Sequence, residues 1–315
     1  MQLGLVDLID PRLSGLVAES RAFYAQRGAG RGPSSLEELR RLRATAPAPA
    51  TSGPPAAVEV VRACSRSVQV RIHEPASGEV AGVFLEIHGG CFSAAGSDVG
   101  DRVLADALDL AVVSVDYRLA PEHPWPAAPD DCETAALWLA DHAQDRFDTK
   151  KLLIGGFSAG ATLAMSTLLR LRDRPVAAYG TAVMQFGTYD LSGLTPAGRL
   201  ISYEYFLDAY AGAAEDRTHP DISPIYADLV GLPPVLIVVG ATEEPNRYRP
   251  TTPPGSVLSI CSARRPTTGS CTSPKMPDRL RAGQPVSRWP ALAPVGATSH
   301  VDGGPLTQVL PHVRQ

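Results

Sequence analysis

The chain carries two kinds of apolar pattern, one alternating and one continuous. Residues 58–61 and 67–72 alternate between apolar and polar positions, which is typical of half-buried antiparallel strands. Four later runs are apolar almost throughout, as in strands buried on both faces of a parallel sheet: residues 83–87, 111–115, 151–155 and 235–239. Helix-like stretches separate them: residues 103–110, 127–142 and 161–171. Strands that alternate with helices predict an α/β fold, with a mostly parallel central sheet flanked by helices.

The two ends of the chain depart from this central pattern. Residues 1 to about 45 show helical periodicity, and the segment 34–39 (SSLEEL) predicts a capped helix start. We therefore expect an N-terminal helical region over residues 1–50 and a core over residues 51–245. Residues 246–315 hold nine basic residues against two acidic ones and 11 of the 29 prolines, and they show no strand or long-helix pattern. This last segment is atypical for an α/β domain.

Composition places the protein in a broad class without indicating an activity. The 315 residues are 44% hydrophobic and 20% charged, with a formal net charge of -4, which is ordinary for a globular protein. The mild acidic balance gives no reason to expect nucleic acid as a partner, and no apolar run approaches the roughly 20 residues that span a bilayer. Asp7 and Asp10 stand where a secretory signal would be basic and then apolar. The five cysteines are scattered and lack metal-ligand spacing, so we expect a cytoplasmic protein without a metal.

A Gly-Phe-Ser-Ala-Gly sequence at residues 156–160 carries the strongest chemical signal. It follows an apolar run and precedes a helix-like stretch, as a nucleophile elbow of the G-x-S-x-G type requires. Gly156 and Gly160 would permit a turn too tight for a β-carbon, and Ser158 would stand above the sheet beside the first amides of the helix. We therefore expect Ser158 to be a nucleophile; the competing interpretation is a glycine-rich turn with an incidental serine.

The sequence His-Gly-Gly-Cys-Phe at residues 88–92 directly follows another apolar run. Glycines at the end of a parallel strand leave backbone N–H groups unshielded, which suits an oxyanion hole. Gly89 and Gly90 would donate two of its hydrogen bonds and the amide of Ala159 a third, whereas His88 would hold the loop through hydrogen bonds. The alternative is a plain turn between a strand and a helix.

With these two motifs, three further stretches closely resemble the hormone-sensitive-lipase family of α/β-hydrolase carboxylesterases. They are residues 115–128 (VDYRLAPEHPWPAA), 223–226 (SPIY) and 231–235 (GLPPV). The resemblance covers roughly residues 1–244 and implies the α/β-hydrolase fold, with the N-terminal helices as a cap. It also implies that the first stretch is a structural loop beside the elbow, in which we expect Arg118 and Glu122 to form an ion pair.

The family implies a Ser-acid-His catalytic triad in that chain order. The nucleophile corresponds to Ser158 and the acid to Glu243, three residues after the glycine that ends the last matched strand. Glu244 is a close rival, and the alternative for both is a solvated loop carboxylate. The family's histidine motif has no counterpart after the acid, which leaves His300, with the more similar flank, and His312. The alternative for both histidines is a surface position without a catalytic role.

Two interpretations of the region after Glu244 stay open. Either part of it is read in a shifted frame, or it is a divergent C-terminus that supplies His300. Smaller departures from the family lie closer to the site. Cys91 stands where the family usually has a third glycine, and its thiol has no evident histidine to activate it as a nucleophile. Phe157 replaces the Asp or Thr that commonly precedes the serine, which leaves the subfamily open.

The resemblance implies a serine carboxylesterase, a carboxylic ester hydrolase acting on short-chain acyl esters with water as the second substrate. Such an enzyme needs no metal and no cofactor. The alternative is a catalytically impaired α/β-hydrolase-like binding protein that keeps the cleft but lacks a functional catalytic histidine. In either case the expected partner is a small-molecule ester, and the oligomeric state is left open.

Overall fold

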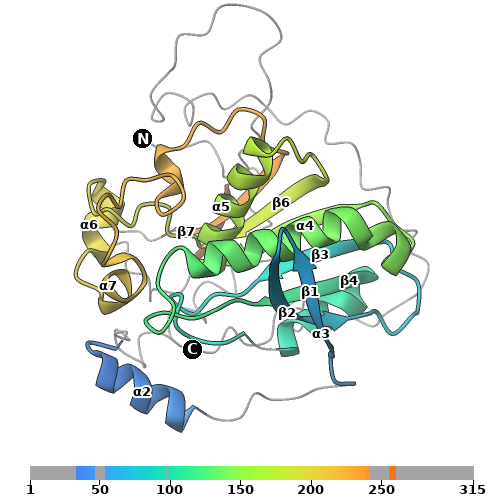
Figure 1. The fold of residues 1–315 in the computed structure, drawn as a ribbon, viewed down its shortest axis with the longest axis horizontal. Coiled ribbons are helices and arrows are strands. Elements are labelled where there is room, and N and C mark those ends of the chain that lie inside the picture. The colour runs from blue at the N-terminus through green and yellow to red at the C-terminus, as the bar shows by residue number, and fades with distance from the viewer. Residues whose placement is uncertain (1–32, 47–53, 97, 242–254, 260–315) are drawn as a thin grey trace, which may run out of the picture. The chain divides into compact units, whose positions relative to one another are not determined.

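The computed structural model describes residues 33–46, 54–96, 98–241 and 255–259 (Figure 1). The chain divides into two compact units, residues 1–265 and 266–315, and every described residue belongs to the first. Within the described ranges, no helix is both long and apolar enough to cross a membrane.

An eight-stranded sheet forms the centre of this unit, in the order β1-β2-β4-β3-β5-β6-β7-β8. Its strands are β1 (Ala57–Ala63), β2 (Arg66–His73), β3 (Gly82–Ile87), β4 (Leu110–Asp116), β5 (Leu152–Phe157), β6 (Tyr179–Gln185), β7 (Val235–Ala241) and β8 (Gly255–Ser259). Neighbours from β4 through β3, β5 and β6 to β7 run parallel. β2 is antiparallel to both β1 and β4, and β8 is antiparallel to β7. This topology confirms the predicted α/β fold with a mostly parallel sheet.

Helices cover both faces of the sheet. They are α2 (Leu36–Thr45), α3 (Asp98–Leu108), α4 (Ala127–Phe147), α5 (Ala159–Asp173), α6 (Pro196–Ile201), α7 (Tyr205–Ala211) and the short 3₁₀ helix η3 (Pro224–Tyr226). Val83, Leu85 and Ile87 of β3 join the large core that includes α4 and α5, whereas Phe84 packs with Ala105 of α3. Because successive strand side chains point to opposite faces, α3 covers one face, and α4 and α5 cover the other (Figure 1).

The structure corrects the sequence prediction for several elements. β6, α6 and α7 were not predicted, and in β6 the residues Gly180, Thr181 and Gln185 interrupt the apolar pattern. β8 lies in the segment where no strand was expected; its pairing with β7 is a backbone ladder, which does not require an apolar run. The predicted helix over residues 103–110 begins five residues earlier and ends at Leu108, because Asp109 is left-handed with φ of 51°.

α2 is the described part of the predicted N-terminal helical region. Its first turn is capped as the sequence predicts, because the Ser35 hydroxyl accepts a hydrogen bond from the Glu38 amide at 3.2 Å. Glu38 in turn accepts hydrogen bonds from the amide and the hydroxyl of Ser34, at 2.8 and 2.7 Å. Leu39 is its one residue that is buried among the described elements. Local capping therefore sets where α2 begins, and one apolar side chain contributes to its docking.

Candidate active site

Ser158 occupies the turn between β5 and α5. Its backbone has φ of 54° and ψ of -120°, a conformation that non-glycine residues rarely adopt and that costs about 1–3 kcal/mol. The Ser158 amide donates to the Gln185 carbonyl of β6 at 2.8 Å, and the Ser158 carbonyl accepts from the Ala161 amide at 3.0 Å. The side chain is half-buried and makes no capping hydrogen bond to α5. A strained serine between a parallel strand and a helix has the geometry of a nucleophile elbow.

Three glycines let the elbow lie directly against the end of β3. A β-carbon on Gly156 would stand 2.3 Å from the Ile87 carbonyl oxygen, and one on Gly160 would stand 1.8 Å from the same atom. A β-carbon on Gly89 would stand 2.6 Å from the Phe157 carbonyl oxygen. All three obstacles are backbone atoms, which cannot rotate aside. The close approach of the two motifs therefore depends on glycine at these positions.

The loop after β3 presents the amides that were predicted to form an oxyanion hole. Gly90 has φ of 108°, which favours glycine, and its carbonyl accepts hydrogen bonds from the amides of Ser93 and Ala94 at 2.9 and 3.0 Å. Among the described residues, no acceptor takes a backbone hydrogen bond from the amides of Gly89, Gly90 or Ala159. These donors are therefore available to a bound group beside Ser158.

His88 holds this loop from the inside. One ring nitrogen, Nδ1, lies 2.8 Å from the Gly89 carbonyl oxygen, and the ring stacks on Tyr117 with centroids 4.1 Å apart. The Tyr117 hydroxyl donates to the His88 carbonyl at 3.0 Å. Burial lowers the pKa of His88 to about 4, so the imidazole is neutral at physiological pH. Its contacts are those of a residue that positions the loop.

The far side of the loop is fixed by Phe92, which is fully buried and stacks on Tyr210 with centroids 3.9 Å apart. The Phe92 carbonyl accepts a hydrogen bond from the Ala120 amide at 2.9 Å. Burial, with a smaller contribution from Glu204, raises the pKa of the neighbouring Cys91 thiol to about 11. A thiol that stays protonated at neutral pH is a poor nucleophile, which disfavours Cys91 in that role.

The ion pair predicted between Arg118 and Glu122 is wrong. Arg118 pairs with Asp131 of α4 at 2.9 Å, and Glu122 accepts two hydrogen bonds from Arg43 of α2 at 2.8 and 2.9 Å. Residues four apart face one another on a helix, but this segment is not helical, so its two charges point to different partners. Both arginine pairs connect the loop beside the elbow to a helix.

Arg43 also contacts the loop after β3, a support for the candidate site that sequence reasoning missed. Its Nε donates to the Ser93 carbonyl at 2.8 Å, and its Nη2 donates to the Ala120 carbonyl at 2.6 Å. These partners lie 50 and 77 positions away along the chain, so no local pattern marks the arginine. Through Arg43, α2 is joined to the loop after β3 and to the loop that contains Ala120 and Glu122.

The predicted acid and base candidates lie outside the described residues: Glu243, Glu244, His300 and His312. β7 ends at Ala241, two positions before the first of them. In the described part of the chain, no histidine hydrogen-bonds to the Ser158 hydroxyl. Of the predicted site residues, the described structure brings together Ser158 and the glycine loop after β3, because Gly89 lies against Phe157.

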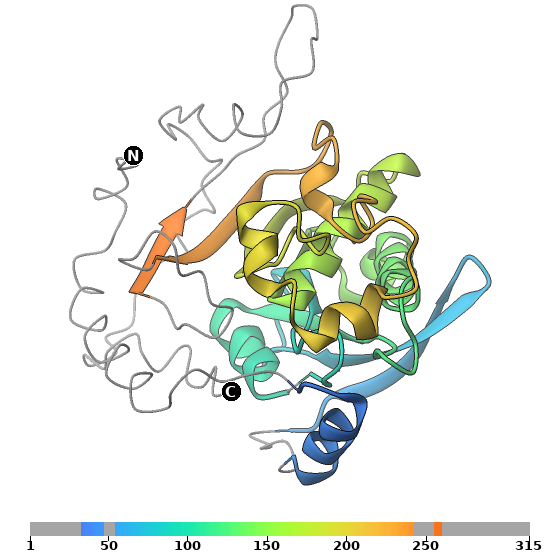
Figure 2. The same ribbon diagram turned by 90° about the vertical axis from the view of Figure 1, so that its left-hand side faces the viewer.

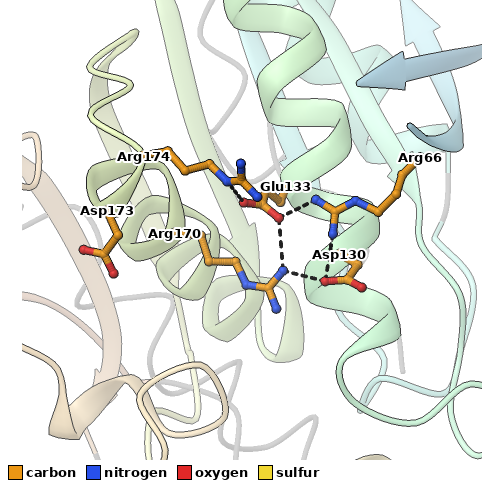
Figure 3. Close-up of a pocket in the computed structure, with 6 residues that line it drawn as sticks. All are labelled: Arg66, Asp130, Glu133, Arg170, Asp173 and Arg174. Atoms are coloured by element: carbon orange, nitrogen blue, oxygen red, sulfur yellow. Dashed lines mark hydrogen bonds and ion pairs between the residues drawn. The ribbon is translucent and has the colours of Figure 1, made fainter. Parts of the chain in front are cut away.

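A charged pocket of about 450 Å³ lies at the other end of α5 (Figure 3). Its lining residues carry charges of both signs: Arg66, Asp130, Glu133, Arg170, Asp173 and Arg174. Glu133 is 4% exposed and pairs with Arg66 at 2.5 Å, Arg174 at 2.6 Å and Arg170 at 3.3 Å. At about 1.5 Å of rise per residue, Arg170 lies roughly 18 Å along the helix from Ser158. The pocket is an ion-pair network that ties α4 and α5 to β2, separate from the candidate active site.

Comparison with known proteins places the chain in a family. A profile of the alpha/beta hydrolase fold matches residues 84–247. The carboxylic ester hydrolase LipN of Mycobacterium tuberculosis is 29% identical over 255 residues, which cover 73% of this chain and 67% of LipN. The gibberellin receptor GID1A of Arabidopsis thaliana is 29% identical over 196 residues, which cover 55% of this chain and 56% of the receptor. The chain thus spans between about half and two thirds of the length of these relatives.

A solved structure agrees with these matches. The hyperthermophilic esterase of the archaeon Pyrobaculum calidifontis superposes with a TM-score of 0.56 at 27% identity, covering 78% of this chain and 82% of that chain. The family profile runs from β3 to just beyond β7 and so includes both glycine motifs. The chain therefore belongs to the α/β-hydrolase fold family, and its esterase relatives confirm the resemblance to the hormone-sensitive-lipase family.

Proposed function

We propose that the protein is a serine carboxylesterase that hydrolyses short-chain acyl esters. The observation that carries this proposal is the elbow, where strained Ser158 lies against a loop whose amides, at Gly89 and Gly90, have no described backbone acceptor. Acyl transfer needs a nucleophile and oxyanion donors that reach the same carbonyl group. The names of LipN and the P. calidifontis esterase support ester hydrolysis, and the preference for short acyl chains rests on the family resemblance.

In this reaction Ser158 Oγ attacks the ester carbonyl carbon while its proton passes to the base. The negative charge that develops on the carbonyl oxygen is stabilised by the amides of Gly89, Gly90 and Ala159. The first turn of α5 contains no acidic residue, so the positive end of its dipole adds to this stabilisation. The alcohol leaves with the proton, and water then hydrolyses the acyl-enzyme and restores the serine.

The remaining triad positions belong to the same proposal. We assign the acid to Glu243 and the base to His300, because the family order places both after the nucleophile. His300→Ala tests this assignment: it should abolish ester hydrolysis about as strongly as loss of the serine does. Full activity in His300→Ala would remove His300 from the mechanism while leaving the role of Ser158 intact.

Hydrolysis of p-nitrophenyl acetate and butyrate by the full chain tests the nucleophile. Ser158→Ala should lower kcat/KM by at least about 10³-fold. The matched control is Ser77→Ala, an exposed serine in the loop before β3, which should hydrolyse both esters at the wild-type rate. A phosphonate ester should label Ser158 covalently, as read by peptide mass spectrometry. Equal hydrolysis by the wild type and Ser158→Ala would overturn the proposal.

A second candidate function is ligand binding without turnover. It is favoured by one relative, the gibberellin receptor, whose name describes a receptor on a similar chain. A binding protein of this kind would take up a small ester without releasing alcohol, and Ser158→Ala would leave its affinity nearly unchanged. Calorimetric titration with a short-chain ester, run beside the hydrolysis assay, separates the two functions.

A further inference from the structure

A second polar cluster joins α3 to the sheet, and α3 covers the face opposite α4 and α5. His73 is the last residue of β2, and Asp98 and Asp101 lie in the first turn of α3. One possible ligand atom from each of the three residues lies within 4.8 Å of the other two. Asp98 and Asp101 are three positions apart, so the helix presents both carboxyl groups on one side. A strand end and a helix face thus converge on one point.

Polar atoms in this cluster lack partners although they are buried. His73 is 1% exposed, and in the described part of the chain neither Nδ1 nor Nε2 makes a hydrogen bond. Its Nε2 faces Asp98 Oδ1 at 3.5 Å. Asp101 is 7% exposed, and its Oδ2 likewise has no described hydrogen-bond partner. Buried polar atoms rarely lack hydrogen-bond partners in this way, so the arrangement indicates a ligand that accepts lone pairs from His73 and Asp101.

The charge of the cluster also favours a cation. Two guanidinium groups, Arg71 and Arg102, stand among four carboxyl groups: Glu86, Asp98, Asp101 and Asp116. Arg71 contacts Asp98 through Nη1 and bonds to Asp116 through Nε at 2.8 Å, whereas Arg102 donates to the Glu74 carbonyl at 2.7 Å. Carboxyl groups therefore outnumber guanidinium groups around His73, which suits a bound cation.

We propose that His73, Asp98 and Asp101 form a binding site for a divalent transition-metal ion of the Zn²⁺ class. One imidazole nitrogen and two carboxylate oxygens suit such an ion, with water as the fourth ligand on the side where the Asp98 side chain is 33% exposed. Zn²⁺ in a tetrahedral site holds its donor atoms about 3.3 Å apart, so small side-chain rotations close the set. Arg71 orients Asp98 from outside, as outer partners of metal ligands do.

The ion would stabilise the fold rather than take part in ester hydrolysis. It joins the end of β2 to the first turn of α3, a helix that packs on β2 and β4. Because the three ligands meet only in the folded chain, metal binding shifts the equilibrium toward that state. The site is independent of Ser158, so its test does not depend on whether the chain hydrolyses esters.

Zn²⁺ binding to the full chain, first freed of metal by dialysis against a chelator, tests the site. We expect one equivalent of Zn²⁺ to remain after gel filtration, as measured by elemental analysis. Zn²⁺ at about 100 times its Kd should raise Tm by roughly 5 °C or more. Ca²⁺ and Mg²⁺, which prefer oxygen ligands, should shift Tm far less. No retained Zn²⁺, or an equal response to Ca²⁺, would show that the site does not exist.

Substitutions locate the bound ion. His73→Gln and Asp101→Asn should lose the retained Zn²⁺ and the rise in Tm. The matched controls are His142→Gln on α4 and Asp106→Asn on α3, both exposed, which should retain the ion fully. Unchanged retention in His73→Gln would place the ion elsewhere and overturn the proposal.

Spectroscopy on the unaltered chain covers the case in which the His73 variant does not fold. With Co²⁺ in place of Zn²⁺, the ligand-field spectrum should be that of nitrogen and oxygen donors, and X-ray absorption should show imidazole scattering. Thiolate charge-transfer bands would assign the metal to a cysteine such as the exposed Cys64 and would contradict the proposed ligands.

Discussion

The two ends of α5 meet opposite physical conditions. At its N-terminus, Ser158 has a strained backbone, the first turn carries no acidic residue, and the Ala159 amide has no described backbone acceptor. At its C-terminus, Arg170 and Arg172 lie in the last turn, where positive charge complements the helix dipole. Arg170 also pairs with Asp221 at 2.6 Å. At the N-terminus, backbone amides beside the Ser158 hydroxyl have no described backbone acceptor, whereas at the C-terminus the charged groups are paired.

This contrast distinguishes the candidate active site at one end of α5 from the stabilising ion pairs at the other end. The presence of a pocket would not distinguish them. The charged pocket of Figure 3 lies at the satisfied end, where each carboxylate already has arginine partners. A substrate would have to displace those ion pairs in order to bind there. At the other end, a ligand could bind the amides beside the strained Ser158 without displacing any described backbone hydrogen bond. The following substitutions test whether the two ends differ in this way.

Gly160→Ala should have the largest effect, at the N-terminal end. Its β-carbon would lie 1.8 Å from the Ile87 carbonyl oxygen and 2.6 Å from the His88 carbonyl oxygen, so β3 and α5 would have to separate. We expect a loss of about 3 kcal/mol or more in the free energy of unfolding. Urea denaturation measures it, with Gly180→Ala in β6 as the control, because that β-carbon meets nothing closer than 3.9 Å. Equal midpoints for the two variants would show that the elbow is not tightly packed.

Glu133→Gln should have the next largest effect, at the C-terminal end. It leaves three arginines facing a neutral amide, with Arg66 and Arg170 only partly exposed. Hydrogen bonds to a charged group contribute about 1.5–3 kcal/mol, so we expect a loss of that order in the free energy of unfolding. The kcat of ester hydrolysis should stay at the wild-type value, because the site is roughly 18 Å from Ser158. A parallel fall in kcat would mean that the two ends of α5 are coupled.

The Glu133 carboxylate should also make the free energy of unfolding depend on pH. Burial alone would raise the pKa of Glu133, but hydrogen bonds from Arg66 and Arg174 outweigh it, and the pKa lies below its ordinary value of 4.5. Its stabilising contribution is therefore fully present above that ordinary value and is lost as the pH falls through the lower, folded-state pKa. Denaturation midpoints measured from neutral to acidic pH should fall less steeply in Glu133→Gln than in the wild type. Identical slopes would contradict the lowered pKa.

The elements that could be predicted from sequence are those that depend on local physics. β3 and β4 are buried on both faces, so nearly every side chain in them is apolar. The elbow could be predicted because its steric demand falls on two glycines that flank the serine itself. β6 could not, because its burial varies from residue to residue and polar side chains break the run. The local rules of strand burial and tight turns were sufficient for the first group only.

Ion pairs between residues far apart in the sequence could not be predicted from these local rules. Sequence reasoning paired Glu122 with Arg118, four positions away, yet the partner of Glu122 is Arg43, 79 positions away. Arg118 instead finds Asp131 on the next helix, 13 positions on. Which of many charges meet depends on how α2 and α4 dock, and that docking is set by the whole core. The candidate acid and base, Glu243 and His300, lie outside the described residues and stay predictions.

Arg43→Ala should have a smaller effect, confined to the loops at the N-terminal end of α5. It removes the hydrogen bonds to the Ser93 and Ala120 carbonyls and the solvent-exposed ion pair with Glu122, at a cost of about 1 kcal/mol in stability. Hydrogen exchange should speed up in α2 and in the loop that contains Ser93, and kcat/KM should fall by up to about tenfold. Arg41→Ala is the control on the same helix, since that side chain is 70% exposed. Equal exchange in both variants would show that Arg43 does not anchor the loop.

Arg174→Ala should have the smallest effect, although it removes a partner of Glu133. The Arg174 side chain is 48% exposed, so its bond to Glu133 at 2.6 Å is screened by water and should contribute about 0.2–1 kcal/mol. A double-mutant cycle with Glu133→Gln measures that coupling by urea denaturation. A coupling as large as the full Glu133→Gln effect would mean that one exposed arginine carries the network. The expected small value follows from redundancy, because Arg66 and Arg170 still neutralise the carboxylate. Ser158 has no such substitute, which is why the loss of one group should be tolerated at one end of α5 and not at the other.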